Sequence, residues 1–165
     1  MDSFIQKLIK LDNILAKGEG WALISFVVVM TVVVLLQVIY RYFLMQPLYW
    51  SEELARYLFV WTSILGAALS VHRRGHFGMD FFFRMLPLRW RRSFAFLILL
   101  LMGIVVMVLL VQGIVLVQKT ADQQSPAMEI SMAWAYASLP VGAALMAIHL
   151  LVMFFKEARG EPGIQ

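Results

Sequence analysis

Four long apolar runs constrain this chain more than any other feature of its sequence. They cover residues 21–44, 54–71, 94–117 and 133–155. Helices of about 18–24 residues are roughly 27–36 Å long, which matches the ~30 Å hydrocarbon core of a bilayer. The chain is 62% hydrophobic and only 15% charged, whereas a soluble domain is about 45–50% apolar. We therefore predict an all-α integral membrane protein with four transmembrane helices.

Shorter amphipathic segments flank these runs. In residues 1–20, apolar side chains recur at helical spacing while charged ones take other faces, which is typical of a helix lying along the membrane surface. Residues 77–92 show a similar pattern that Pro87 interrupts, and we predict a second interfacial segment there. The apolar run after residue 20 is too long for the core of a signal peptide. Residues 1–165 are thus predicted to form a single membrane domain.

Basic residues are distributed unevenly among the connections. Eleven of the 14 Lys and Arg residues lie in the N-terminal segment, the loop after the second run and the C-terminal tail; the others are Arg41, Arg56 and Lys119. Because cytoplasmic loops carry the excess of Lys and Arg, we predict that both termini are cytoplasmic. The hairpin between the first two runs would then face outward. The net charge of +4 comes from these connections and indicates no nucleic-acid partner.

The hairpin between the first two runs holds charges at the depth where the membrane begins. Glu52 and Glu53 precede Arg56 by four and three residues, so a helix would bring them to one face. Arg41 reaches the same depth from the preceding run, and Trp50 lies beside these charges. Charges in membrane segments are costly and are usually paired or functional. We predict that these residues form a charge network that fixes the hairpin and contacts a partner.

No arrangement of residues indicates catalysis. Ser70 and His72 are candidates for a nucleophile and a base, but side chains two residues apart on a helix point in different directions. We predict no catalytic, cofactor or metal residues, and without cysteine the chain has no disulfide. His72 and His149 could ligate a haem iron from facing helices, as in a membrane anchor of a respiratory complex. We favour ordinary histidines at the membrane edge, with His76 hydrogen-bonded to Asp80 in the loop after the second run.

Solute transport by this chain alone is not indicated. Transport sites usually lie near the bilayer midplane and use broken helices or ionisable groups. The first and third runs have no ionisable residue at mid-depth, and the second has its charges at one end. Small residues four apart predict close helix packing instead; the pairs are Ser63 and Ala67, Gly66 and Ser70, and Ser138 and Gly142. A structural subunit is favoured over a small carrier that works alone.

Several motifs taken together are recognisable. They are Arg41-Tyr42-Phe43; Trp50-Ser51-Glu52-Glu53-Leu54-Ala55-Arg56-Tyr57-Leu58-Phe59-Val60-Trp61; Leu65-Gly66-Ala67-Ala68; Leu86-Pro87 with His76 and Asp80 before it; and Leu139-Pro140-Val141-Gly142. With these motifs the sequence resembles, over nearly its whole length, the small membrane subunit (DctQ-type) of tripartite ATP-independent periplasmic (TRAP) transporters. His76 and Asp80 resemble the cytoplasmic loop of that family.

The resemblance implies a function that residue patterns alone do not. A small subunit of this kind binds a large membrane subunit (DctM-type), which carries substrate and sodium ions by an elevator-like movement. A periplasmic substrate-binding protein (DctP-type) delivers an organic acid, such as a C4-dicarboxylate, a keto acid or sialic acid. The resemblance therefore implies a non-catalytic, multi-pass protein of the bacterial inner membrane. It would brace the large subunit, contact membrane lipids and need no cofactor.

Overall fold

The described part of the chain is built from helices. The computed structural model describes residues 2–73 and 88–159. Its elements are α1 (Asp2–Tyr42), α2 (Tyr49–His72), α4 (Leu88–Thr120), α5 (Ala133–Tyr136) and α6 (Ser138–Ala158). Four stretches are long and apolar enough to cross a membrane, namely Ile5–Tyr42, Tyr49–His72, Ser93–Thr120 and Ala133–Ala158. The predicted all-α fold with four spans is confirmed.

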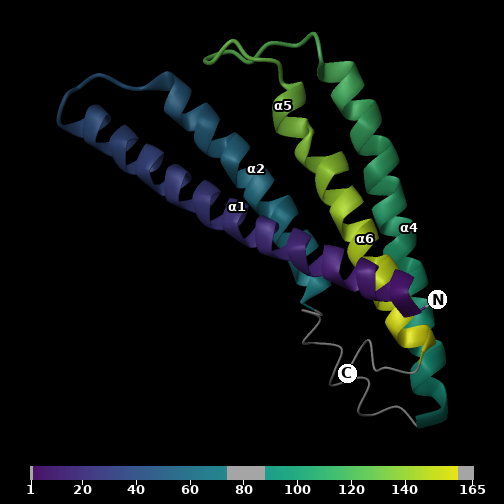
Figure 1. Ribbon diagram of the computed structural model, residues 1–165. Helices are drawn as coiled ribbons and strands as arrows, with labels where there is room; N and C mark the ends of the chain where they lie inside the picture. Colours follow the sequence, from purple (N-terminus) through teal and green to yellow (C-terminus); the bar gives the residue numbers. More distant parts are fainter. Residues whose placement is uncertain (1, 74–87, 160–165) are drawn as a thin grey trace.

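The helices form a row in which α2 and α6 lie between α1 and α4 (Figure 1). Helices α1 and α2 are an antiparallel pair, as are α4 and α6. The start of α1, the end of α2, the start of α4 and the end of α6 lie together, and we call this the termini end. The opposite end, which we call the loop end, holds the α1–α2 turn and the α4–α5 loop. Helix α1 crosses α6 near the termini end and diverges from α4 towards the loop end.

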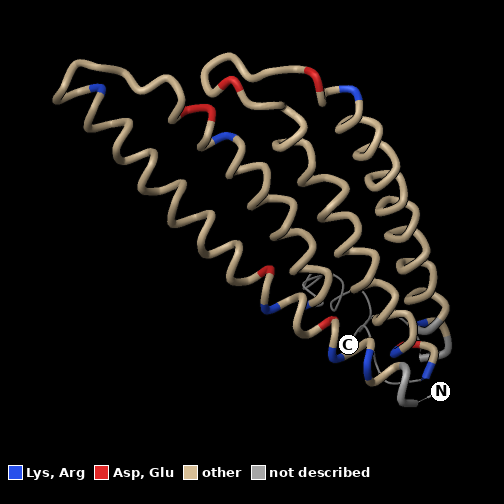
Figure 2. Tube along the Cα trace, turned by 45° about the horizontal axis from the view of Figure 1, so that its top comes forward, with Lys and Arg blue, Asp and Glu red and all other residues tan. Residues whose placement is uncertain are grey.

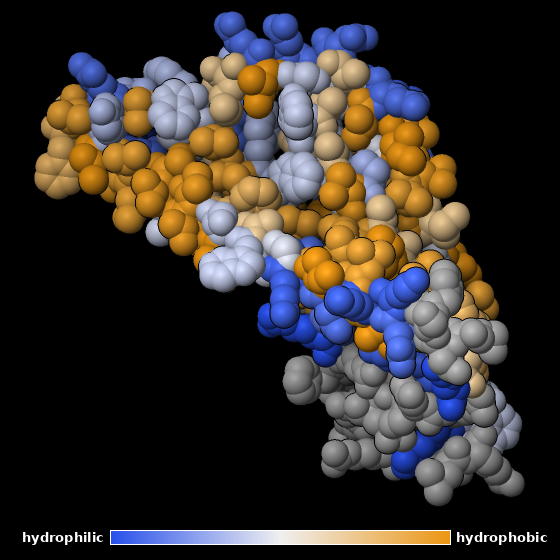
Figure 3. All heavy atoms as spheres, in the orientation of Figure 1, coloured by the Kyte–Doolittle hydropathy of each residue, from blue (hydrophilic) through white to orange (hydrophobic). Residues whose placement is uncertain are grey.

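Charged residues gather at the two ends of the bundle (Figure 2). Between them the face drawn in Figure 3 is largely apolar. In sequence terms, residues 20–40, 57–71, 93–118 and 130–148 contain no Asp, Glu, Lys, Arg or His. This apolar zone is what a bilayer requires of the lipid-facing surface of a spanning bundle.

Helix α1 is one unbroken helix of 41 residues. The segment predicted to lie along the membrane surface therefore continues without a break into the first span. Less exposed residues recur along α1 at alternating spacings of four and three; they are Ile5, Ile9, Asp12, Ala16, Glu19, Leu23, Phe26, Met30, Val33, Gln37 and Tyr40. A repeat of 3.5 residues keeps one stripe of a helix facing its neighbours. The stripe is mostly apolar, so its two acids stand out.

Glycine permits a close contact between α2 and α6. A Cβ atom on Gly142 of α6 would lie 2.1 Å from Cγ2 of Ile64 on α2. The predicted packing pair of Ser138 and Gly142 is therefore used, and both residues are buried. Among the described residues the pairs on α2 pack against no other helix, because Ser63, Ala67 and Ser70 are exposed. A core shared by α2, α4 and α6 surrounds the contact; it consists of Ala68, Val71, Leu99, Val106, Ala143, Met146, Leu150 and Met153.

The fourth span is interrupted near its start. Helix α5 ends at Tyr136, and α6 begins at Ser138 and carries Pro140 in its first turn. Proline has no N–H to continue the preceding ladder, but that group is not needed in a first turn. The short α5 is held to α2 because the indole Nε1–H of Trp61 donates to the carbonyl of Trp134 at 3.0 Å.

Candidate functional site

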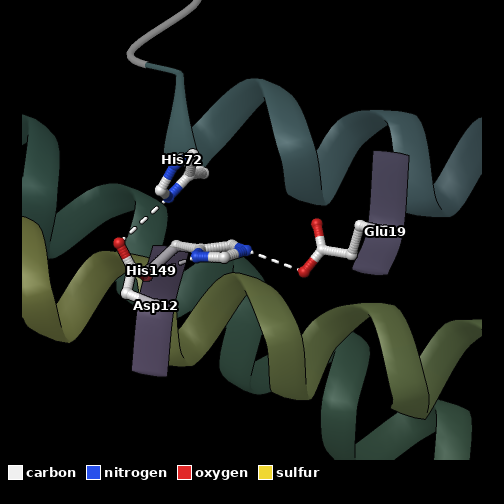
Figure 4. Close-up of polar contacts among 4 residues, drawn as sticks. All are labelled: Asp12, Glu19, His72 and His149. Carbon is white, nitrogen blue, oxygen red and sulfur yellow. Dashed lines mark hydrogen bonds and ion pairs between the residues drawn. The ribbon is translucent and has the colours of Figure 1, made fainter. Parts of the chain in front are cut away.

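Two acids and two histidines form a buried cluster near the termini end (Figure 4). Asp12 and Glu19 come from α1, His72 is the last residue of α2, and His149 lies in α6. Asp12, Glu19 and His149 are only 3%, 5% and 2% exposed. We call these four residues the His–carboxylate cluster. It joins the three helices α1, α2 and α6.

His149 bridges the two acids of α1. Its Nδ1 lies 2.6 Å from Oδ1 of Asp12, and its Nε2 lies 2.9 Å from Oε1 of Glu19. Asp12 and Glu19 are seven residues apart, which is two helical turns or about 10.5 Å, and the imidazole fits between their carboxylates. The other oxygen of Asp12, Oδ2, lies 2.9 Å from Nδ1 of His72. Asp12 therefore contacts both histidines at once.

The contacts define the charge of the cluster. An ionised carboxylate only accepts hydrogen bonds, so both ring nitrogens of His149 must donate when Asp12 and Glu19 are ionised. His149 is then a cation between two anions. One atom stands apart: within the described residues, Oε2 of Glu19 is buried and has no hydrogen-bond partner. Removing one member of the cluster would leave another buried charge without its partner, which lowers the stability of the fold.

The cluster does not fit a haem. Axial ligation would place the macrocycle and its iron between His72 and His149. Their ring centroids lie 5.1 Å apart with the rings tilted by 59°, and Asp12 occupies the space between their Nδ1 atoms. The alternative of a haem-bearing anchor is therefore not supported.

A third buried acid organises the loop end. Glu53 of α2 is 5% exposed. Its Oε2 accepts hydrogen bonds from the backbone N–H groups of Ala127 and Met128, at 2.9 and 3.2 Å. The hydroxyl of Tyr57, one helical turn away, donates to Oε1. Glu53 thus ties the α4–α5 loop to α2 across 74 residues of sequence.

The predicted charge network is only partly brought together. Arg56 and Glu52 form an ion pair at 3.3 Å, with side chains 66% and 70% exposed, whereas Glu53 is turned to the α4–α5 loop. The Arg41 guanidinium lies 5.9 Å from the ring centroid of Tyr42. Arg41 and Glu52 line one hollow of about 400 Å³. The fifth predicted residue, Trp50, is 41% exposed. The loop end therefore exposes this indole together with the Glu52–Arg56 ion pair. His76 and Asp80 lie outside the described residues.

Asp12 and Glu19 are not predicted as site residues from the sequence. His72 and His149 are predicted near the same membrane edge, but without an acid between them. A usable signal was present, because Asp12 and Glu19 occupy equivalent positions of a seven-residue repeat that is mostly apolar. Acids at such positions face another helix rather than solvent. Their partner, 130 residues or more away in sequence, could not be read from that pattern.

Glu53→Gln should loosen the α4–α5 loop. The amide retains one oxygen, so it cannot accept from Tyr57 and from both backbone groups, and it loses the charge that strengthens these bonds. We expect amide hydrogen exchange at Ala127 and Met128 to become about tenfold faster or more. The control is Glu52→Gln on the neighbouring, exposed residue, which should leave exchange in this loop unchanged. Equal exchange in both variants would contradict the role assigned to Glu53.

These features define a class of protein. The chain is a small, multi-pass helical membrane protein whose polar chemistry lies near its two ends, with an uncharged zone between them. More particularly, it belongs to the DctQ family. The family described as "Tripartite ATP-independent periplasmic transporters, DctQ component" matches residues 30–160. The family and the four spans identify a multi-pass protein of the bacterial inner membrane.

Individual relatives are similar over most of this chain. The sialic acid TRAP transporter small permease protein SiaQ of Vibrio cholerae is 32% identical over 70% of this chain and 66% of its own length. The C4-dicarboxylate TRAP transporter small permease protein DctQ of Rhodobacter capsulatus is 35% identical over 68% and 50%. The sialic acid TRAP transporter permease protein SiaT of Haemophilus influenzae is 29% identical over 79% and 21%. The chain thus spans less than two thirds of the length of these relatives.

Proposed function

We propose that this chain is the non-catalytic small permease subunit of a sodium-coupled TRAP transporter that takes up an organic acid. Membership of the DctQ family is the observation that carries the proposal. Similar proteins are named for sialic acid and for C4-dicarboxylates, so a carboxylate is the cargo we infer. A keto acid belongs to the same chemical class. A periplasmic binding protein would deliver this cargo.

A large membrane subunit is the principal partner in this proposal. SiaT of Haemophilus influenzae, itself named a permease protein, matches 79% of this chain with only 21% of its own length. A unit like this one is therefore a small part of that longer chain. We infer that here the remaining permease function lies in a separate polypeptide of the DctM type.

The fold suits a brace better than a carrier. A carrier needs binding groups at mid-depth, and residues 20–40, 57–71, 93–118 and 130–148 contain no Asp, Glu, Lys, Arg or His. Buried acids also restrain the helices at both ends. Asp12 and Glu19 connect α1 to α6, and Glu53 connects α2 to the α4–α5 loop. A bundle restrained in this way can serve as a fixed support for a moving partner.

The loop end is the contact surface we assign to the partners. Its exposed polar residues include Glu52 and Arg56. Farther along α2, towards the termini end, the small residues Ser63, Ala67 and Ser70 are exposed, and small residues allow a helix of the large subunit to approach closely within the membrane. With both termini in the cytoplasm, as the distribution of basic residues indicates, the loop end faces the periplasm. There it can meet both the large subunit and the docked binding protein.

Arg56→Ala tests this assignment. Its ion pair with Glu52 is largely exposed and contributes about 0–1 kcal/mol to folding, so thermal stability of the isolated subunit should be unchanged. Recovery of the large subunit by co-purification, and uptake in liposomes containing all components, should fall several-fold. The matched control is Lys119→Ala, another exposed basic residue at this end, which should affect neither. Unchanged co-purification and uptake for Arg56→Ala would refute the contact.

Reconstitution tests the function itself. The isolated chain in liposomes should move no carboxylate, and addition of the large subunit, the binding protein and a sodium gradient should produce uptake. Uptake by the chain alone would show that it is a carrier and would overturn the proposal.

A further inference from the structure

We propose that Asp12, His72 and His149 bind a divalent transition-metal ion such as Zn²⁺, and that Glu19 orients His149 for this purpose. One ligand atom from each of the three residues lies within 4.8 Å of the others. The ligands come from α1, α2 and α6. A single ion would therefore connect three helices at the termini end. The inference is independent of the transport function.

The donor set suits such an ion. Both imidazoles direct Nδ1 at the same carboxylate, at 2.6 Å for His149 and 2.9 Å for His72. An ion between them would bind about 2.0–2.2 Å from each nitrogen and oxygen, which small side-chain rotations can provide. Imidazole favours zinc, copper, nickel and iron, whereas magnesium and calcium prefer oxygen ligands. Two histidines and one carboxylate leave a fourth position for water.

Glu19 supplies the feature that distinguishes a metal site from a chance group of polar residues. Histidines that bind metals usually donate their other N–H to a carboxylate, which sets the tautomer and the ring orientation. Nε2 of His149 lies 2.9 Å from Oε1 of Glu19, so Nδ1 is left to coordinate. Glu19 is 5% exposed and its Oε2 has no partner among the described residues. A nearby divalent charge would compensate for this buried carboxylate.

The charge of a divalent ion matches the two acids of the cluster. With both histidines as neutral ligands, one divalent ion neutralises Asp12 and Glu19. Because the Nδ1 atoms must carry no proton when they coordinate, binding the ion releases protons. The other described charges beside His72 are Lys17 and Arg73, which are exposed and therefore screened by solvent.

Access to the cluster exists from one side. His72 is half-buried, with 21% of its side chain exposed, whereas the His149 side chain is fully enclosed. A groove of about 480 Å³ between α1 and α2 reaches His72 and is lined by Lys17, Trp21, Leu69 and Arg73 among others. An ion can enter through this groove and keep its water on that side.

Cobalt titration tests the proposal on the full chain in detergent micelles. After treatment with a chelator, Co²⁺ should bind once per chain, give visible d–d absorption bands, release protons and be displaced by Zn²⁺. His72→Asn removes the most exposed ligand and should abolish these bands. His76→Asn removes the one other histidine of the chain and should preserve them. Glu19→Gln keeps all three ligands and should weaken binding about 10- to 100-fold.

The variants also separate binding from folding. Circular dichroism and elution as a single species would show that His72→Asn is folded; should it unfold, His72→Gln takes its place in the same titration. Absence of d–d bands in the wild-type chain would overturn the proposal. So would bands that survive in the folded His72 variant or that disappear in His76→Asn.

Discussion

In the metal-free protein, Asp12→Asn should lower the free energy of unfolding by about 3–5 kcal/mol, the cost of removing one partner from a buried charged set. The Asp12 carboxylate accepts from both His149 and His72 while 3% exposed. An asparagine has one oxygen, so one histidine loses its acceptor and meets an N–H group instead. The measurement is unfolding of the purified chain in mixed micelles with increasing denaturing detergent.

Two further variants make this result specific. Asp122→Asn makes the same chemical change on an exposed residue at the loop end and should change stability by less than about 0.5 kcal/mol. The triple substitution Asp12→Leu, Glu19→Leu and His149→Leu removes the charges together, and it should be closer to wild type than Asp12→Asn alone. A loss of equal size for Asp12 and Asp122 would mean that the cluster does not restrain α1.

Gly142→Ala should lower the free energy of unfolding by about 1–3 kcal/mol, which is the usual cost of forcing extra atoms into a packed contact. The added Cβ would meet Cγ2 of Ile64 at 2.1 Å, so α2 and α6 must separate. Because these helices share the core, the shift should also reduce co-purification with the large subunit. The same detergent unfolding measurement gives the change in stability.

Gly103→Ala is the matched control. It makes the same change within a membrane helix, but no atom lies within 4 Å of the added Cβ, and alanine is the better helix former by about 1 kcal/mol. It should be neutral or slightly stabilising. The double variant Gly142→Ala, Ile64→Ala lacks the clashing Cγ2. Its loss of unfolding free energy should therefore be smaller than the sum of the losses of the two single variants. A loss equal to that sum would show that the contact between residues 142 and 64 does not cause the effect.

The helices extend beyond the apolar runs from which the spans were predicted. The second run covers residues 54–71, and α2 begins at Tyr49 and includes Glu52 and Glu53 in its first turns. The third run covers residues 94–117, and α4 extends from Leu88 to Thr120. An apolar run marks the part of a helix that can lie in hydrocarbon, while backbone hydrogen bonding extends beyond it into the polar interface.

The polar contacts were harder to predict because a local sequence pattern does not specify which distant residue a polar side chain contacts. Spacing correctly placed Glu52 beside Arg56, one helical turn apart. It also placed Glu53 with Arg56, although two backbone N–H groups of a distant loop bind that carboxylate instead. A buried carboxylate gains more from several donors in a desolvated place than from one flexible, exposed arginine.

Composition and the order of apolar and charged segments were enough to establish a helical membrane protein with four spans, since lipid leaves few other ways to satisfy the backbone. Nothing local to Asp12 or Glu19 indicates that His149 lies between them. That arrangement depends on how α1 crosses α6, which is decided by the packing of the helices against one another. The contacts of His149 with Asp12 and Glu19, which join residues more than 100 positions apart, are therefore decided by the tertiary structure.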